Sequence, residues 1–188
     1  MLAPTCNFQI EYPRIAERRW GKIISFSAGH LVSLFVMAFV FFQHIIPKCK
    51  AGLVHFELND YPMMISTLFG LATPCTYLWM GIFFWLLHTW MNFWAEITRF
   101  ADRRFYSDWW NAGNLSEFWR KWNYPIHHWL VRHCYYPLIR KGVSSDVART
   151  MTFVLSAVFH EYVIIGIFRS VRFYAFFAMV VCIPLINL

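Results

Sequence analysis

The stretch TMTFVLSAVFHEYVIIGIF, residues 150–168, decides the fold class of this chain. Glu161 is its only formally charged residue, and a helix needs about 20 apolar residues to cross the roughly 30 Å hydrocarbon layer of a bilayer. The stretch therefore predicts a membrane-spanning helix. An ionisable residue inside such a span is costly, so His160 and Glu161 also indicate a functional site.

The composition of the whole chain points the same way. Of the 188 residues, 59% are hydrophobic and only 14% are charged, whereas soluble domains average about 25% charged residues. We predict an all-α protein, a polytopic bundle of transmembrane helices. The net charge of +7 would suit nucleic acid, but basic residues beside apolar spans more often set membrane orientation, so no nucleic-acid partner is expected.

We expect one domain over residues 1–188, with four spans and one long polar segment. The spans are predicted at about 23–46, 65–94, 150–168 and 172–188, and a cytoplasmic loop at about 96–149. Basic clusters at 14–22 and from Arg99 onward place both of those segments on the cytosolic side, and residues 48–60 form a short hydrophilic link on the other. Neither terminus looks like the end of a bundle, so we expect a fragment truncated at both ends.

The second span contains the helix breaker Pro74. It predicts either one long kinked span or a short interfacial helix followed by a span from about Cys75. Gly70 and Gly81 in the same stretch would permit close packing between helices.

His160 has the properties of a general base. Successive helical side chains diverge by about 100°, so His160 and Glu161 face different sides. The small residues Ser156 and Ala157 lie one turn before His160 and leave room beside the imidazole. A neutral imidazole in a water-poor site can accept a proton. The alternative is a histidine that only hydrogen-bonds between helices.

The polar segment carries an aromatic, histidine-rich block. Helical spacing predicts one polar strip formed by Ser116, Arg120, Asn123, His127 and Cys134. Pro125 allows two outcomes: a new helix begins near it, or the helix bends and frees a carbonyl near Lys121. An interfacial aromatic belt without a catalytic role is the alternative.

Metal binding is not expected. Histidines 127, 128 and 133 do not fall on one helical face, and no carboxylate completes a ligand set. The zinc motif H-E-x-x-H is also absent after His160, because Ile164 stands where the second histidine would be.

Residues 105–111, FYSDWWN, resemble F-Y-x-D-W-W-N, the motif of the sterol and diacylglycerol acyltransferase branch of the membrane-bound O-acyltransferase family. Trp122-Asn123, and then His160-Glu161 in a membrane span, match that branch in order and approximate spacing. Within the branch, residues 126–129 (IHHW) and 132–137 (RHCYYP) are more similar to diacylglycerol acyltransferases than to sterol acyltransferases.

The resemblance implies a partial membrane-bound O-acyltransferase fold with a buried reaction chamber. It implies that His160 and Asn123 are catalytic, with Glu161, Trp122 and His127 in supporting roles. It also implies an acyl-CoA-binding motif made by Phe105, Tyr106, Asp108, Trp109, Trp110 and Asn111.

The implied reaction transfers a fatty acyl group from acyl-CoA to the free hydroxyl of diacylglycerol and makes triacylglycerol. Acyl-CoA is a co-substrate, and no cofactor is expected. The implied setting is the endoplasmic reticulum membrane, with membrane lipids as surroundings and a homo-oligomer at full length. The alternatives are a sterol or wax-alcohol acyltransferase, a transporter in which His160 lines a polar path, and an inactive fragment or structural subunit.

Overall fold

Long uncharged runs form long helices in the computed structural model, which describes residues 6–186. The helices long and apolar enough to cross a membrane are Trp20–Glu57, Tyr61–Ile97 and Ser145–Phe168. The described residues contain no β-strand, so the predicted all-α membrane fold is confirmed. The chain divides into two compact units, one formed by Glu11–Arg103 and the other by residues 6–10 with 104–186.

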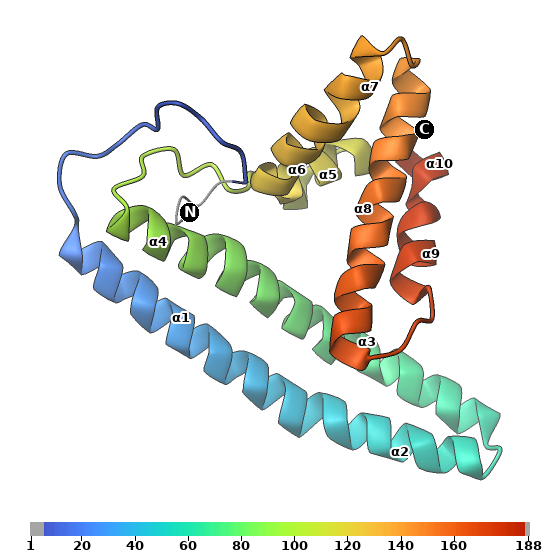
Figure 1. Ribbon diagram of the computed structural model, residues 1–188. Helices are drawn as coiled ribbons and strands as arrows, with labels where there is room; N and C mark the ends of the chain where they lie inside the picture. The colour runs from blue at the N-terminus through green and yellow to red at the C-terminus, as the bar shows by residue number, and fades with distance from the viewer. Residues whose placement is uncertain (1–5, 187–188) are drawn as a thin grey trace. The chain divides into compact units, whose positions relative to one another are not determined.

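The first unit is an antiparallel hairpin of two long helices (Figure 1). The first helix comprises α1 (Trp20–Val40), η1 (Phe41–Ile45) and α2 (Ile46–Glu57), and the second comprises α3 (Tyr61–Phe83), η2 (Phe84–Trp90) and α4 (Met91–Ile97). Here η1 and η2 are π-helical turns that shift the side-chain register without breaking the helix. Each long helix measures about 55 Å at 1.5 Å per residue, so its ends extend beyond the hydrocarbon layer.

The hairpin corrects one sequence prediction and decides between two alternatives in another. Residues 48–57 are helical in α2, because their charged side chains can reach water without interrupting backbone hydrogen bonds. The true turn is Leu58–Asp60, where Asn59 has a φ of 56° and the Asp60 carboxylate accepts from the Met63 N–H at 3.3 Å. At Pro74 the helix continues unbroken, so the alternative with a single long span is the one observed.

Close packing at Gly70 and Gly81 is confirmed. A Cβ at Gly81 would lie 2.8 Å from Met37 Cγ of the facing helix, closer than carbon atoms approach. At Gly70 the Lys48 Nζ fills the corresponding place, 3.2 Å away. Many large apolar side chains on the outer faces of the hairpin are exposed, as expected for a surface in contact with lipid.

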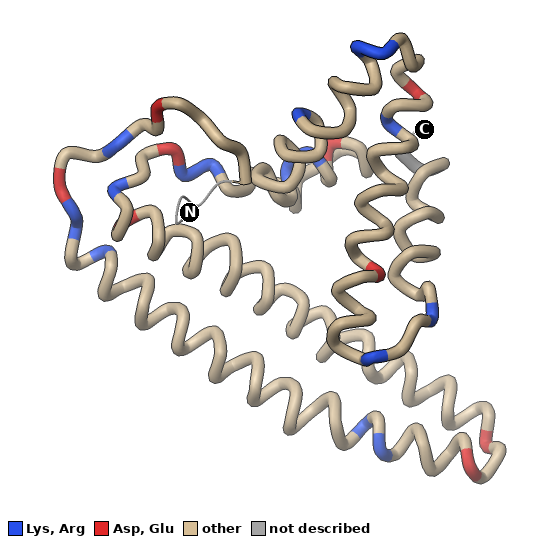
Figure 2. Tube along the Cα trace, viewed as in Figure 1, with Lys and Arg blue, Asp and Glu red and all other residues tan. Residues whose placement is uncertain are grey.

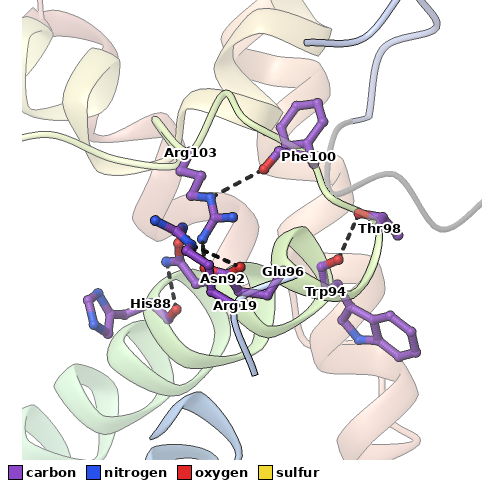
Figure 3. A network of polar contacts seen from close by, with 8 residues as sticks. All are labelled: Arg19, His88, Asn92, Trp94, Glu96, Thr98, Phe100 and Arg103. Atoms are coloured by element: carbon purple, nitrogen blue, oxygen red, sulfur yellow. Dashed lines mark hydrogen bonds and ion pairs between the residues drawn. The ribbon is translucent and has the colours of Figure 1, made fainter. Parts of the chain in front are cut away.

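Glu96 closes the hairpin at the end opposite the turn (Figure 3). Its side chain is fully buried and accepts hydrogen bonds from Arg19 Nη2 at 2.6 Å and from Arg103 Nη1. Arg103 Nε also donates to the Phe100 carbonyl at 3.2 Å. One carboxylate thus binds an arginine that precedes the first helix and an arginine that follows the second.

Backbone pairing reinforces this closure. The Ile15 N–H donates to the Arg99 carbonyl at 2.9 Å, and the Ala101 N–H donates to the Pro13 carbonyl at 2.9 Å. Basic residues gather at this end, while the helices between the two ends carry few charges (Figure 2). The clusters at 14–22 and 99–103 therefore lie at the same end of the hairpin, as expected for segments on one side of a membrane, and their cytosolic orientation stays a prediction.

The second unit joins short helices to one membrane-spanning helix. Its elements are η3 (Trp109–Asn111), α5 (Leu115–Trp122), α6 (Tyr124–Leu130), η4 (Val131–Tyr135), α7 (Tyr136–Arg140), α8 (Ser145–Phe168), α9 (Tyr174–Val180) and α10 (Cys182–Ile186). A turn at Gly142, with φ of 83°, sends α8 back alongside the preceding helices (Figure 1). Residues 174–184 are apolar but shorter than a span, and the fourth span stays a prediction, as does the single domain.

Candidate active site

Asn123 lies at a break between two helices. It has φ −150° and ψ 89°, ends α5 and is the N-cap of α6, with Pro125 in the first turn of α6. A new helix therefore begins near Pro125, which is the first of the two expected outcomes. The expectation of one continuous polar strip from Ser116 to Cys134 is wrong, because the chain direction changes at Asn123.

The capping bond fixes the orientation of the Asn123 amide. Oδ1 accepts from the Ile126 N–H at 3.2 Å, as in most N-caps. The other end of the amide, Nδ2, can only donate hydrogen bonds. The cap therefore leaves a defined donor directed away from the backbone of α6.

The FYSDWWN segment packs against this helix break. The Ser107 N–H donates to the Lys121 carbonyl at 3.0 Å, and the Tyr124 N–H donates to the Phe105 carbonyl at 2.9 Å. Proline lacks an N–H and clashes with the carbonyl four residues earlier, so Pro125 leaves the Lys121 carbonyl free for Ser107. The two bonds hold Trp122-Asn123 from both sides.

The aromatic residues of the motif add to this packing. The Trp109 ring meets the Trp122 ring edge-to-face, with centroids 4.9 Å apart, and meets Phe118 in the same way at 5.7 Å. Phe105 is only 3% exposed, whereas Trp110 is 66% exposed. In this chain the motif is thus largely a support for the Asn123 region, with Trp110 its most exposed ring.

His160 lies on α8, and one of its ring nitrogens forms a hydrogen bond with the backbone of the same helix. Nδ1 is 2.8 Å from the Ser156 carbonyl, which can only accept, so Nδ1 carries the hydrogen. In the neutral ring, Nε2 then has a free lone pair. The His160 side chain is exposed, so the described residues alone do not enclose it.

Glu161 faces the other side of α8, as its position next to His160 predicts. It is 4% exposed, and its carboxylate accepts from the backbone N–H groups of Phe173 at 2.7 Å, Ala175 at 3.0 Å and Phe176 at 3.2 Å. These bonds attach the start of α9 to α8 and stabilise a chain turn in which Phe173 has a φ of 58°. Through these hydrogen bonds the Glu161 carboxylate stabilises the fold.

His127 lies one helical turn after Asn123. Burial lowers the pKa of its imidazole, and the neighbouring His128 and Arg120 lower it further. A neutral His127 is thus favoured beside the Asn123 amide. The described residues include no group of three His, Cys, Asp or Glu side chains placed to hold a metal ion.

The lowered pKa of His127 predicts acid sensitivity. The unfolded chain takes up the proton first as the pH falls below about 6.5, so folding stability is complete above that pH and decreases below it. We expect His127→Gln to lose less thermal stability than the wild type between pH 7.5 and 5.5. Tryptophan fluorescence during heating in detergent measures this, with the exposed His133→Gln as the matched control. Equal losses in the wild type and His127→Gln would contradict the prediction.

The structure brings some of the predicted residues together and leaves others apart. The FYSDWWN segment, Trp122 and Asn123 form one packed group, and the Trp129 ring on α6 contacts the Phe159 ring, next to His160, at 6.0 Å. Among the described residues, no hydrogen bond links Asn123 to His160. Sequence reasoning missed Lys121, which is paired with Asp108 and Glu117, and Glu96 with its two arginines.

Known proteins resemble the whole chain. The sequence model of the membrane-bound O-acyltransferase family matches residues 1–188. The chain is 39% identical to rice diacylglycerol O-acyltransferase 1-1 over 195 residues, which cover 100% of this chain and 35% of the relative. It is 36% identical to human diacylglycerol O-acyltransferase 1 over 185 residues, which cover 98% of this chain and 38% of the relative. The chain thus spans just over a third of the length of these relatives.

Proposed function

Because the chain belongs to the membrane-bound O-acyltransferase family, we propose that it forms the catalytic part of a diacylglycerol O-acyltransferase. The enzyme would transfer a fatty acyl group from acyl-CoA to diacylglycerol and release triacylglycerol. The names of the relatives from rice and human support this choice of acceptor. The observation that carries the chemistry is the bond from His160 Nδ1 to the Ser156 carbonyl, because it leaves Nε2 available as a base.

The proposed reaction is a direct transfer. His160 Nε2 takes the proton of the diacylglycerol hydroxyl while its oxygen attacks the thioester carbonyl carbon. Asn123 Nδ2 donates a hydrogen bond to the oxygen that becomes negative. The C–S bond then breaks, the ester forms, and the CoA thiolate recovers the proton from the imidazolium. A thioester is already activated, so neither a covalent enzyme intermediate nor a cofactor is required.

The remaining features of the proposal concern substrates and setting. Basic residues between Arg99 and Lys141 would attract the CoA phosphates, and apolar helix surfaces would accept the acyl tails. The FYSDWWN motif would contribute to acyl-CoA binding through Trp110, its most exposed ring. The setting would be the endoplasmic reticulum membrane, with a homo-oligomer as the assembled form.

The acceptor is tested by product analysis. Membranes containing the protein, expressed at its full gene length, are supplied with labelled oleoyl-CoA and with diacylglycerol, a sterol or a long-chain alcohol in turn. We expect label in triacylglycerol, well above membranes from cells without the protein. Label mainly in steryl or wax esters would reject diacylglycerol as the acceptor, and the absence of any labelled ester would reject acyl transfer.

A further inference from the structure

The Lys121 ammonium connects the FYSDWWN segment to helix α5. Nζ lies 3.0 Å from Asp108 Oδ1 inside the motif and 2.9 Å from Glu117 Oε1 on α5. The Lys121 side chain is 21% exposed, less than either of its carboxylate partners. The proximity of Glu117 and Asp108 raises the pKa of the Lys121 ammonium, and Lys121 in turn lowers the pKa of both carboxyl groups.

The two carboxylates that bind Lys121 also accept hydrogen bonds from the two ends of the loop Ser107–Gly113. Ser107 Oγ donates to Asp108 Oδ1 at 2.8 Å, and the Gly113 N–H donates to Glu117 Oε2 at 2.8 Å. The loop from Ser107 to Gly113 is therefore held at both its start and its end by groups that bind one lysine.

The backbone of the same lysine binds the motif as well. Its carbonyl accepts from the Ser107 N–H at 3.0 Å, and two residues later Asn123 caps α6. Lys121 thus contacts the motif through its side chain and its main chain, directly before Trp122-Asn123.

We propose that Lys121 is a positioning residue, which holds the FYSDWWN loop against the α5–α6 break and so fixes the direction of the Asn123 amide donor. The role rests on the proposed acyl transfer, because it is the Asn123 donor that Lys121 positions. In this proposal Asp108 forms an internal ion pair with Lys121, and other residues of the motif contact acyl-CoA.

A direct role of Lys121 in binding a CoA phosphate makes a different prediction. A lysine that binds the ligand would raise the KM for acyl-CoA when removed, and Asp108 would be needed little. A lysine that positions Asn123 would lower kcat with KM nearly unchanged, since a small displacement of a catalytic group costs rate. It would also show strong coupling between Lys121 and Asp108.

The experiment compares Lys121→Met, Asp108→Asn, the double variant and Lys121→Arg in the protein at its full gene length, with the exposed Lys50→Met as the control. We expect about a tenfold lower kcat for each single removal, with the acyl-CoA KM within about twofold of wild type. The double variant should be no worse than either single variant. Lys121→Arg, which keeps the charge, should recover most of the activity.

Hydrogen exchange of the Ile126 amide, the partner of the Asn123 cap, gives a readout independent of catalysis. It should accelerate in Lys121→Met and Asp108→Asn and stay at the wild-type rate in Lys50→Met and Lys121→Arg. Unchanged kcat with unchanged exchange in Lys121→Met would overturn the proposal, as would a raised KM with unchanged kcat. If the wild type transfers no acyl group, the proposed function fails, and the exchange data still decide whether Lys121 holds the loop.

Discussion

Replacement of His160 by alanine is expected to reduce acyl transfer to the background level. A positioned general base contributes roughly 10²–10⁴-fold to a reaction of this kind, and the Ser156 carbonyl has already selected the ring tautomer with a free Nε2. Alanine removes the base and leaves the backbone of α8 intact, because alanine is the best helix former. The measurement is the initial rate of labelled triacylglycerol formation at saturating oleoyl-CoA.

His44→Ala is the matched control, since His44 is also an exposed histidine on a long apolar helix. Its rate should equal that of the wild type, and both variants should match the wild type in expression and in elution volume in detergent. A His160→Ala protein that keeps more than about half of the wild-type rate would remove the general-base role, and the Ser156 bond would then be purely structural.

Replacement of Asn123 by alanine is expected to lower kcat by about 10²–10³-fold, with little change in the KM for acyl-CoA. Loss of one oxyanion donor costs about 3–4 kcal/mol in enzymes where it has been measured. Alanine also removes the N-cap of α6, which costs about 1 kcal/mol of stability. The kinetic loss therefore has to be separated from the structural one.

Asn123→Asp makes that separation. Aspartate keeps an oxygen that can cap the Ile126 N–H but has no amide donor. We expect Asn123→Asp to unfold at nearly the wild-type temperature and still to lose transfer as severely as Asn123→Ala. If Asn123→Asp retains wild-type turnover, the amide is not the oxyanion donor, and Asn123 acts only as a helix cap.

The sequence was sufficient for features that depend on local periodicity and composition. Uncharged runs predicted the membrane helices, and the 100° step between neighbours correctly placed His160 and Glu161 on different faces of α8. Pro125 predicted a disturbance of the polar block with two possible outcomes, and the new helix that begins near it is the outcome observed. Each of these follows from the covalent properties of residues close together in the chain.

Features that join distant segments were beyond the sequence. Glu96 appeared only as the end of an uncharged run, and nothing in its neighbourhood predicted a bond to Arg19, 77 residues earlier. The π-helical turns η1, η2 and η4 were also missed, because a one-residue shift in helical register leaves no clear pattern in composition. The Asp108 partner of Lys121 required the fold of the loop that precedes α5, whereas the Glu117 partner lies four residues earlier on the same helix, a spacing visible in the sequence.

Glu96 has a consequence for how the two long helices can separate. Its carboxylate is bound by one arginine from before the first helix and one from after the second. Movement of either segment away from the hairpin would leave a buried charge with one partner fewer, which is costly. The hairpin is thus held at one end by this charged contact and at the other by the chain itself, so neither end can fray freely.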